Sequence, residues 1–328
     1  MLLPLFKALE AQGLDPEHLL SNQGWSIDGM TGAATIDQDF ELQIVADALK
    51  MTDDPLLGLK VGAEASFTTY GIYAMLLMTA PTLLDAARAS VQFQALSLLL
   101  SQMTMKMDKD WVEVFYFAPE SEPRLKAFII DRDMMGVYVF LRELLSPTEL
   151  FDTKIRSSRA IPLPKEQAAF ERYFEHEIEF GSAYSSFRIP RSILSRAQKH
   201  GNELAHKLYR VQAFEILSQL YTEMDDIAAR VRQMLNGYES RYPSLTEMAS
   251  MFRCSDRTLR RKLDESNTCY RDLLEEQKKS RVFDMLADRS ISVNEMSDTL
   301  GYTEPASFLR AFKRWTGTTP KLYVKSQQ

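Results

Sequence analysis

The chain has 328 residues, of which 45% are hydrophobic and 26% are charged, with a formal net charge of −6. This length suits two domains with sizeable cores, and an acidic balance argues against a protein that coats nucleic acid without regard to sequence. The charge is uneven, because the segment from Arg241 to the C-terminus holds 16 Lys and Arg against 12 Asp and Glu, a net +4, while residues 1–240 carry −10. A basic C-terminal part on an acidic body predicts that the smaller part meets a polyanion.

The sequence gives little indication of a metal site or of an enzyme active site. The two cysteines, Cys254 and Cys269, and the four scattered histidines have no metal-ligand spacing, and HEIEF at 176–180 lacks the second histidine of a zinc protease motif. Residues 1–253 contain no cysteine, which excludes an alkyltransferase with a cysteine acceptor, and no Gly-rich phosphate loop occurs. We expect no enzyme activity, no metal and no cofactor.

The sequence predicts a cytoplasmic protein in a reducing compartment that does not enter the membrane. Lys7 and Glu10 interrupt the apolar start where a signal peptide needs an unbroken run. The apolar run GIYAMLLMTAP is too short to span a bilayer.

The first hundred residues show mainly helical periodicity. Between residues 4 and 62, apolar residues such as Phe40, Ile44 and Leu49 recur at helical spacing, and Gly, Pro and Asp clusters separate short segments. Residues 70–100 continue as helix, with a break at Ala80-Pro81 that places Thr79 or Thr82 near a helix start.

A change of period marks the next segment. Methionines alternate with polar residues over 103–107, a polar turn follows at 108–110, and WVEVFYF comes next, which together predict a β-hairpin. Further strands are expected at Thr153–Ile161 and Ser185–Ile189, with helices at Arg132–Leu145 and Lys165–Glu175. The N-terminal body is therefore predicted to be α+β.

The hairpin also supplies the candidates for an effector site. An apolar cavity suited to a fatty or aromatic effector would be lined by Met103, Met105, Met107, Trp111, Phe115 and Phe117. Such residues more often form ordinary core, and both interpretations remain open.

After Pro190 the pattern is helical throughout. A stripe with steps of three and four is formed by Leu204, Leu208, Val211, Phe214 and Leu217. Such a stripe packs either against its own domain or against a second copy of the chain, since its step is close to the coiled-coil period. Another helix is expected at Ile227–Leu235, and we place the domain boundary near residue 222.

The C-terminal part contains an internal repeat. Ser-x-x-Glu precedes an apolar run at Ser244 and again at Ser292, and each is a capping box that begins a helix. A small residue follows in each copy (Ala249, Ser297), then a turn position four residues later (Arg253, Gly301), then a second helix capped by Ser255 or Thr303. This is the spacing of two helix-turn-helix units.

Basic residues recur on the second helix of both units. In the first unit, Leu259 and Leu263 are predicted to face inward, with Arg257, Arg260 and Arg261 on another face. In the second, the inward residues are Phe308, Phe312 and Trp315, and the outward cations are Arg310, Lys313 and Arg314.

Residues 270–287 lack Pro and Gly and predict one continuous linker helix. The major groove of B-DNA admits one helix, so two such helices on a rigid scaffold suit successive grooves about 34 Å apart.

The C-terminal segment resembles a known family. LGYTEPASFLRAFKRWTGTTPKLY and SDRTLRRKL are similar to the double helix-turn-helix domain of AraC/XylS transcription regulators, over residues 244–323. DPLLGLKVGAEASFTTYGIYAMLLMTAPTLLDAARASVQF and YFEHEIEFGSAYSSFRIPRSIL resemble the arabinose-binding-type sensor domain found in the group of the ornithine-utilisation regulator. The resemblance implies residues 1–222 as an effector-sensing, dimerising α+β domain and residues 223–328 as an all-α DNA-binding domain. It also implies double-stranded DNA, a small effector, RNA polymerase and a second copy of the chain as partners.

The resemblance further implies particular DNA contacts. They are Arg257, Arg260 and Arg261 in the first reading helix, and Ala306, Ser307 and Arg310 in the second. Ala306 offers only a methyl contact and Ser307 discriminates poorly between bases, so the first helix is predicted to contribute more base discrimination. A ligand-independent DNA-bending protein that uses the same helices is the alternative.

Departures from the family pattern are Arg253, where Gly is more common, Asn267, also at a usual Gly, and Val324, where an Arg commonly follows the final Tyr. Asn tolerates the left-handed conformation, so Asn267 is expected to be harmless. For Arg253 two interpretations stay open: a cost in stability or an extra phosphate contact.

Overall fold

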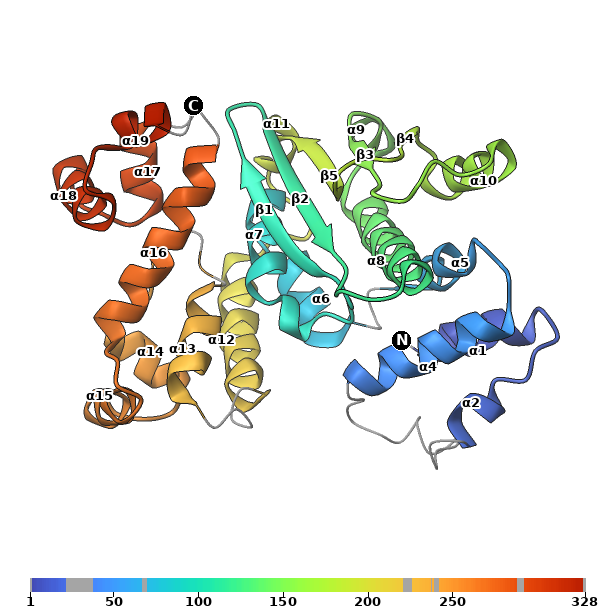
Figure 1. The fold of residues 1–328 in the computed structure, drawn as a ribbon, viewed down its shortest axis with the longest axis horizontal. Coiled ribbons are helices and arrows are strands. Elements are labelled where there is room, and N and C mark those ends of the chain that lie inside the picture. Colours follow the sequence, from blue (N-terminus) through green and yellow to red (C-terminus); the bar gives the residue numbers. More distant parts are fainter. Residues whose placement is uncertain are drawn as a thin grey trace.

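A computed structural model describes residues 2–21, 38–66, 70–220, 226–236, 238, 242–287 and 292–326. Over these described residues, an α+β body is followed by helices without strands, as predicted (Figure 1). The boundary expected near residue 222 lies outside the described residues. No described helix combines the length and hydropathy needed to cross a bilayer.

The N-terminal segment forms short helices, as its periodicity predicted. They are α1 (Leu2–Glu10), α2 (Glu17–Ser21), α4 (Gln38–Met51) and α5 (Leu57–Ala63). Next come α6 (Gly71–Met78), α7 (Leu83–Gln92) and a 3-10 turn, η2 (Gln94–Leu96). Of the two threonines proposed for the helix start, Thr82 is the cap of α7, because its hydroxyl accepts the Asp85 N–H at 3.1 Å.

The predicted hairpin is present as β1 (Gln102–Met107) and β2 (Trp111–Phe117). It belongs to one five-stranded sheet of order β1-β2-β5-β3-β4, completed by β3 (Lys154–Arg156), β4 (Ile178–Glu179) and β5 (Ser185–Pro190). All neighbouring strands are antiparallel except β3 and β4. The strand expected at 153–161 ends at Arg156, and β4 was not predicted, since two residues give no period to read.

A long helix, α8 (Pro123–Leu144), packs beside the sheet; the sequence predicted its start nine residues too late, at Arg132. Two glycines let α5 approach α8 closely: a Cβ at Gly58 would lie 2.7 Å from the Phe128 carbonyl oxygen, and one at Gly62 would meet the Arg132 carbonyl. This contact explains the glycine spacing in GLKVG. The remaining helices of the body are α9 (Pro147–Phe151), α10 (Pro164–Phe174) and α11 (Arg191–Leu194).

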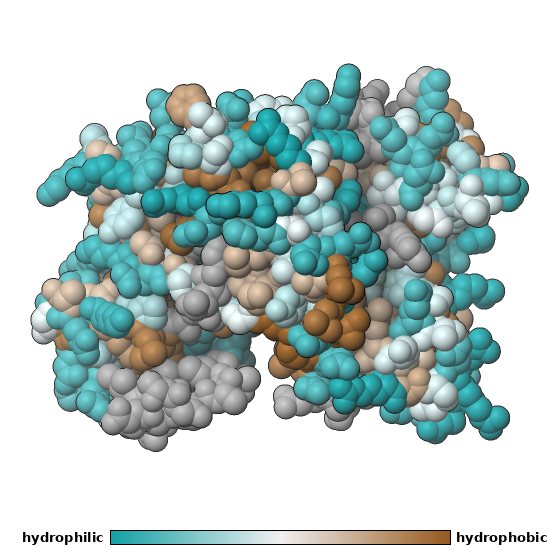
Figure 2. Space-filling view, turned by 180° about the vertical axis from the view of Figure 1, so that it is seen from behind, coloured by the Kyte–Doolittle hydropathy of each residue, from teal (hydrophilic) through white to brown (hydrophobic). Residues whose placement is uncertain are grey.

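Helix α12 (Glu203–Leu220) has two different faces. Phe214 and Leu217 are buried against α6 and η2, whereas Leu204, Leu208 and Val211 are 80%, 56% and 59% exposed. The predicted single stripe is therefore split. Its C-terminal part packs within the chain, and its N-terminal part contributes to a hydrophobic patch on the face shown in Figure 2.

The C-terminal helices form two helix-turn-helix units at opposite ends of one long helix (Figure 1). The first unit is α14 (Leu245–Met251) and α15 (Asp256–Glu265), preceded by α13 (Ile227–Asn236). Helix α16 (Tyr270–Ala287) is the predicted linker helix. The second unit is α17 (Val293–Thr299) and α18 (Pro305–Thr316), followed by α19 (Pro320–Ser326).

Candidate DNA interface and effector cavity

Both predicted capping boxes are present. The Ser244 hydroxyl accepts the Glu247 N–H at 3.2 Å, and the Glu247 carboxylate accepts the Ser244 N–H at 2.7 Å. Ser292 and Glu295 make the same reciprocal pair at 3.2 and 2.8 Å. Each box fixes the residue at which the first helix of its unit, α14 or α17, begins.

The turn positions also match the prediction. Arg253 and Gly301 both have positive φ, of 51° and 68°, and Asn267 has φ of 54° after the first reading helix. An arginine tolerates this conformation less well than glycine. The structure adds a contact that the sequence did not indicate: the Arg253 guanidinium lies 3.3 Å from the Glu215 carboxylate on α12.

Small residues occupy the helix crossings, as predicted, with Ala249 and Ser297 fully buried. Among the described residues the Ser297 hydroxyl has no hydrogen-bond partner. Burying an unpaired hydroxyl is costly, and Ala249 fills the equivalent place in the first unit without one.

We expect Ser297→Ala to stabilise the second unit by about 1 kcal/mol, because it removes the unpaired group without changing the packing. Urea unfolding followed by circular dichroism measures this. The matched control is Ser292→Ala, which removes a bonded cap hydroxyl five residues earlier and should destabilise by about 1 kcal/mol. Equal signs for the two variants would contradict the argument.

The two reading helices begin differently. Ser255 caps α15 as predicted, accepting the Thr258 N–H at 3.2 Å. The prediction that Thr303 caps α18 is wrong: the cap position is Glu304, whose side chain makes no cap hydrogen bond, and Pro305 follows. Proline has no N–H to be capped, so its fixed φ starts the helix instead.

On α15 the predicted cations are all exposed. Arg261 is bound within its own helix, with Nη1 2.5 Å from the Glu265 carboxylate. Arg257 and Arg260 have no ion-pair partner among the described residues. These two guanidinium groups are therefore available to a polyanion, while Leu259 and Leu263 hold the opposite face of the helix in the core, as predicted.

On α18 the predicted cations are also exposed, but Arg314 is held by the linker helix. Its guanidinium binds the Glu275 carboxylate, and the Trp315 indole N–H donates to the same oxygen at 2.6 Å. Arg310 donates to the Ser307 hydroxyl at 3.0 Å, and Lys313 has no ion-pair partner among the described residues. The Arg314 hydrogen bond lowers the pKa of Glu275. The Glu275 cluster therefore fixes α18 on α16 and leaves Lys313 and Arg310 toward solvent.

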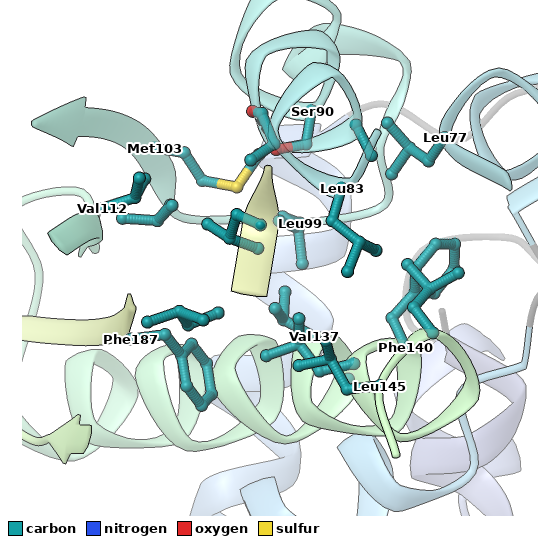
Figure 3. Close-up of a pocket in the computed structure, with 18 of the residues that line it drawn as sticks. Leu77, Leu83, Ser90, Leu99, Met103, Val112, Val137, Phe140, Leu145 and Phe187 are labelled. Carbon is teal, nitrogen blue, oxygen red and sulfur yellow. Dashed lines mark hydrogen bonds between the residues drawn. The ribbon is translucent and has the colours of Figure 1, made fainter. Parts of the chain in front are cut away.

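An apolar cavity of about 100 Å³ lies in the body between α6, α7, the sheet and α8. Figure 3 shows Val137 and Phe140 of α8 pointing toward Leu83 and Met103 across it. None of the described lining residues is charged. An apolar cavity of about 150 Å³ binds benzene, so this smaller one suits a small uncharged group.

Tyrosine hydroxyls are the main polar groups of this cavity. Tyr73 donates to the Ser90 carbonyl at 3.1 Å, whereas Tyr70 and Tyr116 have no hydrogen-bond partner among the described residues. Burial raises the pKa of Tyr70 to about 12 and that of Tyr116 still further, so both hydroxyls keep their protons at neutral pH. Two O–H donors in apolar walls are able to orient a ligand that has a hydrogen-bond acceptor.

The predicted effector residues divide between the two faces of the sheet. Met103 lines the cavity, and Met105 is buried on the same face without lining it; Met107 is also not among the lining residues. Phe115 and Phe117 are on the opposite face, where Phe115 contacts Tyr184 at a ring distance of 4.8 Å. The even-numbered residues of β2, Val112, Val114 and Tyr116, line the cavity instead.

Comparison with known families decides where the chain belongs. Residues 13–198 match the arabinose-binding N-terminal domain of AraC transcription regulators, and residues 248–326 match a helix-turn-helix domain. The chain is an AraC-type transcription regulator. Its N-terminal domain is of the arabinose-binding type, as the sequence indicated.

Other regulators share this organisation over most of their length. The HTH-type transcriptional regulator Rv1395 of Mycobacterium tuberculosis is 26% identical over 84% of this chain and 80% of its own. The ornithine utilization regulator of Pseudomonas aeruginosa is 24% identical over 86% and 82%. The crystal structure of the transcriptional regulator CdpR from Pseudomonas aeruginosa shares the fold, with a TM-score of 0.50 and 23% identity over 98% of this chain and 96% of its own.

In this AraC-type regulator one hydrophobic cluster joins the cavity wall formed by Tyr73, Leu77 and Ala86 to the first helix-turn-helix unit, whereas the sheet side of the cavity belongs to a second cluster. Helices α6 and α7 contribute buried residues to the same cluster as α12 to α15. The Phe214 ring of α12 lies 4.7 Å from that of Phe93, at the end of α7, and 5.8 Å from that of Tyr238. The Tyr238 hydroxyl then reaches the Met251 sulfur of α14 at 3.7 Å. The second unit has a separate core around Phe308 and Phe312.

Most of the cavity wall was not predicted from the sequence. Tyr70 is the N-cap residue of α6, Tyr73 belongs to that helix, and Val137 and Phe140 belong to α8; their helical spacing is that of any core residue. Nothing in a single sequence separates a residue beside a cavity from one in solid packing. Among the described residues no group of three or more His, Cys, Asp or Glu is placed to hold a metal ion.

Proposed function

We propose that this AraC-type regulator binds duplex DNA by inserting α15 and α18 into successive major grooves, and that a small apolar effector controls this binding. Arg257 and Arg260, which are exposed on a capped helix and have no ion-pair partner in the part of the chain that the structure describes, carry the DNA part of the proposal. Arginine forks bind guanine edges and phosphates, and only a projecting helix fits the groove. In the second unit Arg310 and Lys313 take the equivalent part.

The apolar cavity is the proposed effector site. Its described walls are uncharged, and the hydroxyls of Tyr70 and Tyr116 have no partner among the described residues; both features favour a small aromatic or aliphatic molecule with one hydrogen-bond acceptor. Charged metabolites are disfavoured, since no lining residue that the structure describes would compensate their lost hydration.

The shared core offers a physical route for control. A ligand that binds between α7 and α8 acts on the helix that ends at Phe93, and Phe93 packs on Phe214 of α12. The first reading helix has more than one arrangement relative to the body. The effector shifts the equilibrium toward the arrangement that it binds more tightly. The second unit has a core of its own and joins the first through α16.

A second copy of the chain is the proposed occupant of the exposed face of α12. Leu204, Leu208 and Val211 occur at steps of four and three, so an antiparallel pair centred near Leu208 sets each Leu204 against the other chain's Val211. RNA polymerase is the further protein partner of a regulator bound beside a promoter.

We expect Leu208→Glu to convert the dimer to a monomer, because two carboxylates would meet at the two-fold axis. Sedimentation equilibrium of wild type and variant measures this. Leu322→Glu on α19 is the control, since Leu322 is 57% exposed and Leu208 is 56% exposed. A wild-type chain that is monomeric at about 100 µM would argue against this interface.

The proposed function is tested by selection from random duplex oligonucleotides with the full chain. We expect a motif with two half-sites about one helical turn apart, and a binding constant that falls steeply as salt rises from about 50 to 200 mM. Selection without sequence preference would reject it. A ligand-independent DNA-bending protein is favoured if a panel of apolar metabolites leaves both the melting temperature and the DNA affinity unchanged.

A further inference from the structure

A second cavity, of about 290 Å³, lies where α5 meets the first half of α8. The two cavities have no described lining residue in common, because this one uses earlier turns of α8. Its walls are charged, and the ionisable lining residues are Asp53, Asp54, Arg124, Asp131 and Arg159. A pocket of this size is near the lower limit of those that hold small metabolites.

The wall of the cavity includes a buried carboxylate. Asp131 is only 3% exposed, and its Oδ2 accepts a hydrogen bond from the Arg159 guanidinium. Among the described residues its other oxygen, Oδ1, has no hydrogen-bond partner. An ion pair taken out of water costs free energy unless every lone pair is satisfied, so a half-satisfied carboxylate beside a cavity indicates a place for a donor from outside the chain.

The basic groups of the cavity are placed differently. Arg159 is occupied, since it binds Asp131, donates to the Pro55 carbonyl at 3.2 Å and stacks on the Phe170 ring at 5.1 Å. The side chain of Arg124 is 39% exposed, donates to the Thr52 carbonyl and lies 3.7 Å from the fully exposed Asp53 carboxylate. Such a loose pair is easily exchanged for a ligand anion.

Asp54 is not available to a ligand in the same way. Its carboxylate accepts the Leu56 N–H at 3.0 Å and the Lys60 ammonium at 2.7 Å, which together hold the start of α5. Among the described lining residues, Asp131 Oδ1 is the buried acceptor without a partner, and Arg124 is the cation held loosely, by the exposed Asp53. They are seven residues apart on α8, so two turns bring them to one face of the helix.

We propose that this cavity binds a small zwitterion of the amino-acid class, with its ammonium group on Asp131 and its carboxylate on Arg124. A sugar fits less well, because Phe128 is the one aromatic residue among the described lining residues and it is buried. A dicarboxylate would leave Asp131 opposed by like charge. This proposal does not depend on the proposed DNA binding or on the apolar effector, because amino-acid binding can be measured in the absence of both.

Proton linkage supplies a second signature. Burial raises the pKa of Asp131 to about 7, against the opposing effect of Arg159. The other charged groups around it are Arg124, Asp53 and Asp54, with Lys60 bound to Asp54. An ammonium ligand favours the ionised carboxylate and so releases a proton on binding, and its affinity should weaken as the pH falls from about 8 to about 6.

Titration calorimetry of the full chain with the common amino acids tests the proposal. The comparison compounds are the matching carboxylic acids without the amine, the matching amines without the carboxylate, and neutral polyols. We expect at least one amino acid to bind, and Arg124→Gln and Asp131→Asn each to weaken that binding by about tenfold or more. Arg142→Gln is the control: Arg142 is on the same helix, outside the cavity, in an equally loose pair of 3.6 Å with Glu175, and its loss should leave binding unchanged.

Three results would overturn the proposal. They are the absence of binding by any amino acid up to about 10 mM, equal binding by compounds that lack one of the two charges, and an affinity that Arg124→Gln does not change. Because Arg124 is at the rim, that variant keeps the test decisive even if Asp131→Asn fails to fold.

Discussion

The double variant Arg257→Ala/Arg260→Ala is expected to lose about 10²- to 10⁴-fold of its affinity for the selected DNA site, since each lost arginine contact to a base costs about 1–3 kcal/mol. Both side chains are exposed on α15 without ion-pair partners among the described residues, so their removal should not destabilise the fold. Fluorescence anisotropy gives the affinity, and repeated selection with the variant gives the base preference. Preference should relax at the positions that face α15.

The control removes the same charge elsewhere in the C-terminal part. Arg232→Ala/Arg271→Ala takes two exposed cations from α13 and α16, and should weaken binding equally for all sequences without altering base preference. Arg310→Ala on α18 should relax preference less than the α15 double variant, because Ala306 and Ser307 beside it discriminate poorly. The opposite order would contradict the ranking of the two helices.

Phe214→Ala should have the largest effect on stability, and it should separate the sensor domain from the first helix-turn-helix unit. The buried ring packs between Phe93 and Tyr238, so its removal is expected to cost about 3–5 kcal/mol. In the wild type, DNA binding should slow amide exchange in α7, because α7 and the first unit share one core. In Phe214→Ala that protection should disappear while DNA binding persists.

The coupling is distinguished from simple loss of stability by Phe170→Ala. Phe170 is buried in the core around the sheet, to which α7 contributes Leu83 and Leu84 but to which no described residue of α12 to α15 belongs, so the variant should be destabilised to a similar degree yet keep the protection of α7 on DNA binding. Hydrogen exchange with mass spectrometry below the melting onset measures both. If Phe214→Ala retains the full protection, coupling does not pass through this ring.

Much of the geometry of the two helix-turn-helix units could be predicted because its signals are local. A capping box needs only four consecutive residues, and a left-handed turn position is marked by the residues on each side of it. The Ser244 and Ser292 boxes, the turns at Arg253 and Gly301, and the inward Leu259 and Phe308 were therefore all located correctly. The error at Thr303 is of the same local kind, since Pro305 removed the need for a side-chain cap.

The cavity residues could be predicted only in part. Alternation showed that Met103 and Met105 share one face of β1, but not which face of the neighbouring strand meets it. The register sets Met103 opposite Tyr116, which puts the even-numbered residues of β2 on the cavity side and Phe115 on the other. A one-residue change in register would reverse this, so only strand pairing decides it.

The amino-acid sequence by itself determined that two capped helix-turn-helix units with basic second helices follow an α+β body, because helix starts, turns and period are properties of neighbouring residues. Tertiary packing decided which charges remain unpaired, that Glu275 holds Arg314, that α12 is half buried and half exposed, and that Asp131 faces a cavity. These outcomes depend on residues that are distant in the chain and come within a few ångströms only in the folded state. The pattern of neighbouring residues in the sequence does not predict such distances.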